Sequence, residues 1–172
     1  MVERVPADSW TDPFWQGHRD RYLYAARWIE PGEEVNDIAC GVGYGATFLT
    51  HASYRGYDRP AVPDSRFPGE FYAADLNDTS WEPQAADVTV CFETLEHVID
   101  PAHLAGVISR TTRRAVFVSV PVVPTKHDNP WHLTDFAVRD IPLMFGMFEV
   151  AGEWAQPSDL SHVWMFHRRK PG

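Results

Sequence analysis

The sequence predicts an α/β fold in which a doubly wound, mostly parallel sheet carries helices on both faces. Short apolar runs alternate with helical stretches over residues 35–120, which is typical of parallel strands joined by crossover helices. A glycine-rich turn, Gly41-Val-Gly-Tyr-Gly45, directly follows the first of these runs. The last two apolar runs are joined by Gln156-Pro-Ser-Asp-Leu-Ser161, and they predict a hairpin that adds antiparallel strands at one edge.

Each expected element has a local signal. Asp12-Pro13 and Pro31-Gly32 bracket a helix over residues 14–29, whose apolar positions recur with the helical period: Tyr22, Ala25, Ala26 and Ile29. The expected strands span residues 35–40, 55–58, 71–74, 87–92, 115–120, 148–154 and 163–167. The other expected helices span residues 44–51, 102–111 and 135–144.

Two of the expected crossovers are too short for a full helix. Residues 59–70 contain Pro60, Pro63 and Pro68, and proline removes a backbone donor and clashes with the preceding helical turn. Residues 77–86 form a crossover segment that is equally short for a helix. We therefore expect part of one sheet face to be thinly covered, and either the N-terminal helix or a partner subunit of a homodimer to cover it.

Composition limits the classes of function. A hydrophobic content of 44% and a charged content of 23% are those of a soluble globular domain, and the net charge of −9 argues against nucleic acid as a partner. We expect the basic run His167-Arg-Arg-Lys170 to be a solvated tail. The sequence shows neither a signal peptide nor a membrane-spanning segment, so we expect a cytoplasmic protein with reduced thiols at Cys40 and Cys91. The histidine spacing matches no metal motif, so we expect no metal.

The glycine turn predicts a ligand site. In an open parallel sheet, ligands bind at the carboxyl ends of the strands where the strand order reverses. Gly41, Gly43 and Gly45 allow a tight turn and a close approach of backbone N–H groups, and a helix beginning near Tyr44 would direct its positive end there. The turn also satisfies a dinucleotide fingerprint, with Asp58 near the distance for a ribose-binding acid, so a nicotinamide dehydrogenase is the natural rival.

The residues around the turn decide which class of cofactor-binding protein the turn indicates. Asp37-Ile-Ala-Cys-Gly-Val-Gly-Tyr-Gly45 and Cys91-Phe-Glu-Thr-Leu-Glu-His-Val-Ile-Asp-Pro101 resemble the first and fourth motifs of class I S-adenosylmethionine-dependent methyltransferases, in the subgroup called type 11. Four further matches follow the family order: His18-Arg-Asp-Arg-Tyr-Leu-Tyr-Ala25, Tyr57-Asp58, Ala74-Asp75-Leu76 and Asn129-Pro-Trp-His-Leu-Thr-Asp-Phe136. The six matches cover nearly the whole chain, and the fourth-strand motif is the specific one.

The resemblance implies a Rossmann-like fold, S-adenosyl-L-methionine as cofactor and a set of cofactor contacts. Asp58 would accept both ribose hydroxyls, Asp75 would accept the adenine amino group, and Leu76 would complete the contact with the adenine edge. Gly41 and Gly43 would pass close to the methionine part, Phe92 would lie by its amine, and Asp37 would brace the turn. Apart from the resemblance, two roles stay open for Tyr44, Trp131 and Phe136: an apolar wall that shields the sulfonium, or ordinary core packing. The single domain would comprise a helical cap (1–32), a cofactor-binding core (33–120) and a substrate-side loop with the hairpin (121–172).

The expected reaction is transfer of a methyl group to oxygen or nitrogen of a small or medium-sized metabolite. A base is required only if the acceptor arrives protonated. The candidates are His132, His97 and Glu93, with Glu96, His127, Asp128 and Asp135 close by in sequence. Glu96 and His97 have an alternative role in capping a helix or tying loops together. Two other functions stay open: a domain that binds the cofactor without turnover, and an NAD-dependent oxidoreductase.

Overall fold

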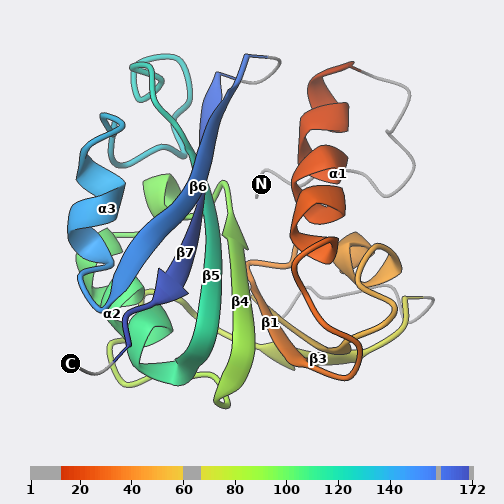
Figure 1. The fold of residues 1–172 in the computed structure, drawn as a ribbon. Helices are drawn as coiled ribbons and strands as arrows, with labels where there is room; N and C mark the ends of the chain where they lie inside the picture. The colour runs from red at the N-terminus through yellow and green to blue at the C-terminus, as the bar shows by residue number, and fades with distance from the viewer. Residues whose placement is uncertain (1–12, 60–66, 158–159, 171–172) are drawn as a thin grey trace.

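The computed structural model describes residues 13–59, 67–157 and 160–170, and a seven-stranded sheet forms its centre (Figure 1). The strand order is β3-β2-β1-β4-β5-β7-β6. Strands β1 to β5 run parallel to one another, whereas β7 is antiparallel to both β5 and β6. The predicted doubly wound sheet with an antiparallel C-terminal hairpin is therefore confirmed.

The elements follow the predicted order. The strands are β1 (Glu34–Ile38), β2 (Ser53–Asp58), β3 (Glu70–Ala73), β4 (Ala86–Phe92), β5 (Thr112–Pro121), β6 (Phe148–Gln156) and β7 (Ser161–Arg168). The helices are α1 (Pro13–Ala26), α2 (Pro101–Thr111) and α3 (Asp140–Met144), with 3-10 turns η1 (Tyr44–Thr47) and η2 (Leu95–His97). None of the helices in the described part of the chain has the length and apolar character that a membrane span requires.

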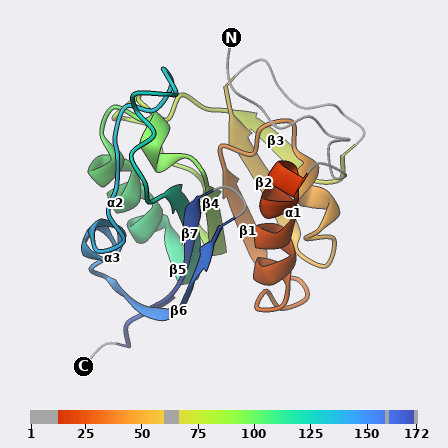
Figure 2. The same ribbon diagram turned by 90° about the horizontal axis from the view of Figure 1, so that it is seen from above.

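The two faces of the sheet carry different helices, as Figure 2 shows from above. On one face, α1 buries Tyr22 and Ala25 in a cluster with Val35 of β1 and Val88 of β4, and Ile29 joins the cluster from the turn after the helix. On the other face, α2 packs on β5 with Leu104 and Ile108 buried, and α3 lies beside α2. The Asp100 side chain caps α2 by accepting the His103 N–H at 2.8 Å, with Pro101 at the first helical position.

The helix expected over residues 44–51 is wrong in length. The chain forms only the 3-10 turn η1, whose first flanking residue, Gly43, has a φ of 88°. A Cβ at Gly45 would lie 2.5 Å from the Tyr22 ring, so α1 approaches this backbone too closely for any side chain at this position. The predicted attraction of a helix dipole for the ligand is therefore not available here. The helix expected over residues 135–144 is likewise shortened to α3.

The shortened crossovers are confirmed where the structure describes them. Residues 74–85 form no helix, and Trp81 from this segment packs edge-on against Tyr57 of β2 with ring centroids 5.6 Å apart. Residues 60–66 of the other crossover lie outside the described residues. Helix α1 packs on β4 at the centre of the sheet, and its Tyr24 ring also reaches the edge strand β6, with its centroid 4.0 Å from that of the Trp154 ring. A homodimer stays a prediction.

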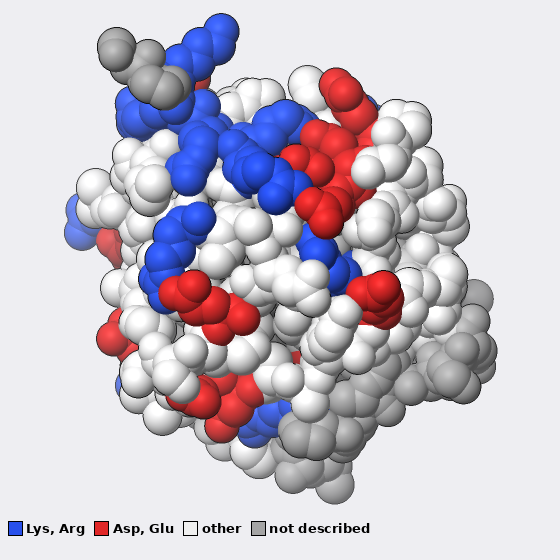
Figure 3. All heavy atoms as spheres, turned by 90° about the horizontal axis from the view of Figure 1, so that it is seen from below, with Lys and Arg blue, Asp and Glu red and all other residues white. Residues whose placement is uncertain are grey.

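Ion pairs gather at the amino ends of the strands, and Figure 3 shows basic and acidic side chains interleaved there. Arg113 bonds the Asp87 carboxylate at 2.8 Å and also contacts Glu34, while Arg114 bonds Glu33 at 2.6 Å. The basic run at residues 167–170 is anchored rather than frayed, because the Arg168 guanidinium lies 5.2 Å from the centre of the Phe148 ring. This end of the molecule pairs its charges internally.

Candidate cofactor pocket and acceptor loop

A cavity opens at the carboxyl ends of β1, β2 and β4. It lies at the switch point between β1 and β4, where successive strands depart in opposite directions, as predicted for a ligand site in this architecture. The residues that line it come from α1, the glycine turn, the ends of three strands, η2 and the loop after β5: His18, Ala39, Gly41, Tyr44, Asp58, Arg59, Ala74, Leu76, Asn77, Phe92, His97, Val98 and Trp131.

The glycine turn forms one wall of this cavity. Gly41 and Gly43 have φ values of 61° and 88°, in the left-handed region that favours glycine. A Cβ placed on Gly41 would meet no atom within 4 Å, so the backbone faces open space there. The Gly41 N–H donates to Asp58 Oδ2 at 2.7 Å, which fixes the carboxylate at the cavity edge. The structure thus brings Gly41 and Asp58 to the same wall, whereas Gly43 is not among the residues that line the cavity and its contact with the cofactor stays a prediction.

Asp37 lies behind the turn and outside the cavity lining. Its Oδ2 accepts the hydroxyls of Tyr22 at 2.8 Å and Tyr54 at 2.5 Å. Burial raises the pKa of Asp37 to about 7, although the two tyrosine hydrogen bonds act in the opposite direction. These contacts join α1, β1 and β2 beneath the glycine turn, which is the bracing position expected for this residue.

The segment after β3 supplies Leu76 and Asn77 to the cavity. Asp75 between Ala74 and Leu76 is exposed, and its Oδ1 accepts the Asn77 N–H at 3.1 Å in a local turn. Asn77 Oδ1 accepts the Ile99 N–H at 2.8 Å, which ties this segment to the loop after η2. Leu76 therefore occupies its predicted place, whereas the adenine contact of Asp75 stays a prediction.

Helix α1 contributes a residue that the sequence did not single out as a ligand contact. His18 lines the cavity, and its Nδ1 lies 3.4 Å from the Tyr44 hydroxyl. Burial lowers the pKa of His18 to about 2, with the nearby Arg21 acting in the same direction, so the imidazole is neutral. Tyr44 and Phe92 line the same region, as predicted, and both are buried. Trp131 also lines the cavity, whereas Phe136 belongs to the core instead of the expected apolar wall.

Glu93 points into a polar network at the ends of β4, β5 and β7. Its backbone has a φ of 48°, and its two carboxylate oxygens accept the hydroxyls of Ser119 at 2.6 Å and Ser161 at 2.8 Å. The buried Arg21 guanidinium lies 3.7 Å from Glu93 Oε1 and donates to Gln156 Oε1 at 3.0 Å. Glu93 lies outside the cavity lining, so its geometry favours holding strand ends together over removing a proton from an acceptor.

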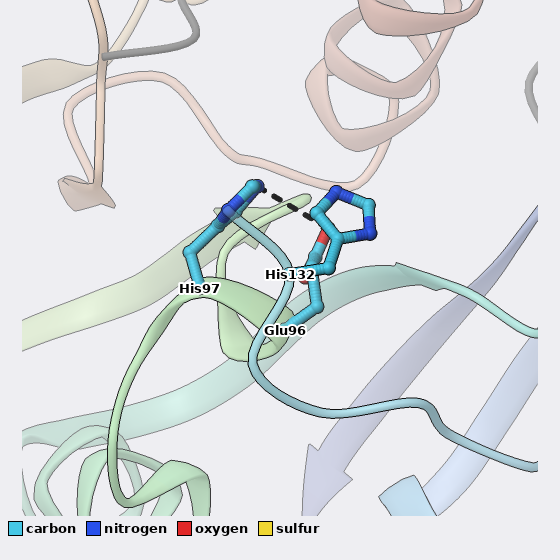
Figure 4. Close-up of side chains that lie close together, drawn as sticks. All are labelled: Glu96, His97 and His132. Atoms are coloured by element: carbon cyan, nitrogen blue, oxygen red, sulfur yellow. Dashed lines mark ion pairs between the residues drawn. The ribbon is translucent and has the colours of Figure 1, made fainter. Parts of the chain in front are cut away.

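The two predicted catalytic histidines do come together, as Figure 4 shows. The ring centroids of His97 and His132 are 4.7 Å apart, at an interplanar angle of 82°. His97 Nδ1 lies 3.0 Å from the Trp131 carbonyl oxygen, and His132 Nδ1 lies 2.6 Å from Thr125 Oγ1. Of the three catalytic candidates, His97 lines the cavity directly, and His132 stands behind it in the loop after β5.

Solved structures resemble the chain over nearly its whole length. The magnesium protoporphyrin IX methyltransferase ChlM of Synechocystis PCC 6803, with bound SAH, matches with a TM-score of 0.73 and 16% identity, covering 98% of this chain and 90% of that one. The N-methyltransferase NodS of Bradyrhizobium japonicum WM9, in complex with S-adenosyl-L-homocysteine, matches with a TM-score of 0.71 and 12% identity, covering 95% and 90%. The chain has the class I methyltransferase fold.

A further match comes from the complex of the Haloferax volcanii Trm112 methyltransferase activator with a protein described as a methyltransferase. Its TM-score is 0.77 at 14% identity, and the match covers 96% of this chain and 94% of that one. At the sequence level, no protein-family model matches, and a search of the curated proteins found no similar sequence. The methyltransferase fold predicted from the ordered motifs is therefore confirmed by structure.

Proposed function

We propose that the protein is an S-adenosylmethionine-dependent methyltransferase that acts on oxygen or nitrogen of a small or medium-sized metabolite. The observation that carries this proposal is the cavity at the switch point, where Asp58, the open backbone of Gly41 and the apolar side chains of Leu76 and Phe92 converge. ChlM and NodS, which share the fold, were crystallised with SAH. Cofactor, fold and site thus support the same activity.

The cavity has the donors, acceptors and apolar walls that this cofactor needs. Asp58 retains acceptor capacity beyond the Gly41 N–H, because each carboxylate oxygen carries two lone pairs, so it would accept ribose hydroxyls. Leu76, Asn77 and Val98 would enclose the base, and Gly41 and Phe92 would lie along the methionine part. When bound, S-adenosylmethionine supplies a methyl group on a sulfonium sulfur, an electrophile that reacts by in-line displacement.

The chain's own task is to hold an acceptor in line and to exclude water, which can supply several kcal/mol by orientation alone. Trp131 and His97 lie at the cavity where such an acceptor would enter. We assign the acceptor contact to His97, with His132 behind it. Because Glu93 accepts two serine hydroxyls, we assign it a positioning role at the ends of β4, β5 and β7.

Cofactor binding tests the first half of the proposal. We expect calorimetric titration with S-adenosylhomocysteine to show binding, and Asp58→Asn to weaken it about 10- to 150-fold, the worth of a hydrogen bond to a charged group. The variant removes the charge and keeps one acceptor oxygen for the Gly41 N–H, at the expense of the Arg59 N–H that Asp58 Oδ1 accepts at 2.6 Å. Asp78→Asn is the matched control, since Asp78 is an exposed acid that bonds only locally to Ser80 among the described residues. Binding of NADH without a response to S-adenosylhomocysteine would favour the oxidoreductase instead.

Methyl transfer tests the second half. We expect a radiolabelled methyl group to pass from the cofactor to a member of a panel of small hydroxyl and amine acceptors, with a mass increase of one methyl group in the product. Trp131→Ala should raise the KM for that acceptor more than it changes S-adenosylhomocysteine affinity, because Trp131 is half-exposed at the loop side of the cavity. Tight cofactor binding with no transfer across the panel would favour a domain that binds without turnover.

A further inference from the structure

Three potential metal ligands from two separate segments converge beside the cavity. Glu96 and His97 belong to η2, and His132 lies in the loop after β5. One ligand atom from each side chain lies within 4.8 Å of the others, and the carboxylate and imidazoles are directed toward a common point (Figure 4). The expectation of no metal was based on local histidine spacing, which does not detect a set assembled across the fold.

We propose that Glu96, His97 and His132 bind a divalent transition-metal ion at the acceptor side of the cofactor cavity. Two imidazoles and one carboxylate are a ligand set for Zn²⁺ or for Mn²⁺, Fe²⁺ and Co²⁺, whereas Mg²⁺ prefers oxygen ligands alone. Metal–ligand bonds of about 2.1 Å place neighbouring ligand atoms about 3 to 3.5 Å apart. Small side-chain rotations would therefore close the present arrangement around an ion.

The hydrogen bonds of the histidines prepare them for this role. His97 Nδ1 lies 3.0 Å from the Trp131 carbonyl oxygen, which can only accept, so the neutral ring carries its proton on Nδ1 and keeps the Nε2 lone pair. This Nε2 is the atom that lies 3.8 Å from Glu96 Oε1. His132 Nδ1 also has a partner, since it lies 2.6 Å from Thr125 Oγ1, a hydroxyl that can either donate or accept. Metal-binding histidines typically have such a partner on the second nitrogen.

The backbone also fixes the distance between the two segments. The Leu133 N–H donates to the Glu96 carbonyl oxygen at 2.7 Å, directly beside His132. The Glu96 side chain is only 2% exposed, so its carboxylate is held among these groups, away from solvent. A buried acid next to two imidazoles is stabilised when a cation binds between them. Hydrogen bonds within the protein therefore hold the three side chains near one another before any ion binds.

The position relative to the cavity suggests what the ion would hold. His97 lines the cavity, so open coordination positions would face the acceptor side. Three protein ligands leave at least one such position, which suits an oxygen atom of a hydroxyl or carboxylate acceptor. This assignment of the acceptor rests on the proposed methyltransferase function, whereas the metal site itself does not. His97 would then act as a ligand instead of a proton acceptor.

The test uses the full chain, stripped of metal with a chelator and free of cofactor. Titration with Co²⁺ should give one equivalent of binding and visible absorption bands of a low-symmetry site, and Zn²⁺ should compete for it. Mg²⁺ at the same concentration should not displace the bound Co²⁺. We expect His97→Ala and His132→Ala each to lower Co²⁺ affinity at least 10-fold. His127→Ala is the matched control, because His127 lies in the same loop, is 67% exposed and neighbours an acid, and it should bind like the wild type.

Two results would overturn the proposal: no Co²⁺ binding below millimolar concentration, or binding that survives both histidine substitutions. Circular dichroism of each variant, together with the S-adenosylhomocysteine affinity of His132→Ala, reports folding, so a lost site is distinguishable from a lost fold. If a variant does not fold, a Zn²⁺-dependent rise in the Tm of the wild type, absent with Mg²⁺, replaces it as the readout. Because the titration contains no cofactor, metal binding without S-adenosylhomocysteine binding would reject the proposed function alone.

Discussion

The buried carboxyl of Asp37 makes stability depend on pH in an unusual direction. Burial raises its pKa from the usual 3.8 to about 7, so the folded protein binds this proton more tightly than the unfolded chain does. A raised pKa contributes stability that is fully present below about pH 4 and is lost as pH rises through 7. We therefore predict that the Asp37 contribution falls across the neutral range.

The magnitude follows from the two pKa values. A difference of about 3 pH units corresponds to about 4 kcal/mol of total free energy between the protonated and ionised limits. Between pH 5.5 and pH 8, the expected loss is about 2 kcal/mol, because the unfolded chain is already ionised over this window while the folded protein titrates within it. A change of this size is a large fraction of the stability of an ordinary domain.

The perturbation is Asp37→Asn, which resembles the protonated acid. The asparagine carbonyl can accept the hydroxyls of Tyr22 and Tyr54, and its amide would take the place of Oδ1, which has no hydrogen-bond partner among the described residues. Urea unfolding at pH 5.5 and pH 8 should show the variant gaining about 2 kcal/mol relative to the wild type at the higher pH. Glu149→Gln is the control, since it neutralises an exposed carboxylate on β6.

The result that refutes this reasoning is a constant difference in unfolding free energy between wild type and Asp37→Asn at the two pH values. Tyr54→Phe provides a second check. It removes a hydroxyl whose hydrogen bond lowers the pKa of Asp37, so the pH-dependent loss should move to higher pH. A loss that moves to lower pH in this variant would contradict the assigned contacts.

Two further substitutions test the packing of the core, both by urea unfolding. Arg21→Met should cost about 3 kcal/mol or more, because it removes the fully buried guanidinium that pairs with Glu93 and Gln156; a loss below about 1 kcal/mol would contradict these contacts. Gly56→Ala should cost about 1 to 3 kcal/mol, since its Cβ would lie 2.8 Å from both Cys40 Sγ and Phe71 Cδ1. Gly106→Ala, whose Cβ would meet its nearest atom at 3.8 Å, should be neutral or stabilising, and equal losses at the two glycines would refute the steric explanation.

The sheet was predictable because its strands are short apolar runs whose positions depend on local sequence. The runs ending at Asp58 and Phe92 end there in the structure as well. The close packing of the turn at Gly45 was not predictable, because the Tyr22 ring that meets it comes from a segment more than twenty residues earlier. Propensity describes what a segment can form, whereas a tertiary contact decides how much of it forms.

The site also contains residues that local sequence could place and residues that only tertiary packing could place. Residues that follow strands, such as Asp58 and Leu76, could be placed by strand topology alone. His18 was missed as a lining residue, although its motif was recognised, because only the packing of α1 on the sheet shows which side of the helix faces the cavity. Asn77 was missed because it follows the motif residues and resembles an ordinary turn residue. The meeting of His97 with His132 depends on a loop path that no periodicity encodes.

The stretch Phe92-Glu-Thr-Leu-Glu-His97 illustrates why motif residues need a structure before they receive roles. Its two glutamates serve different segments, because Glu93 stands outside η2 in a left-handed conformation and reaches Ser119 and Ser161, whereas the Glu96 backbone bonds the loop at Leu133. The motif thereby holds two segments in place beside the cavity: Glu93 holds the ends of β5 and β7, and Glu96 holds the loop after β5. A rigid frame of this kind leaves substrate choice to the loop side chains, since the frame would be the same for any acceptor.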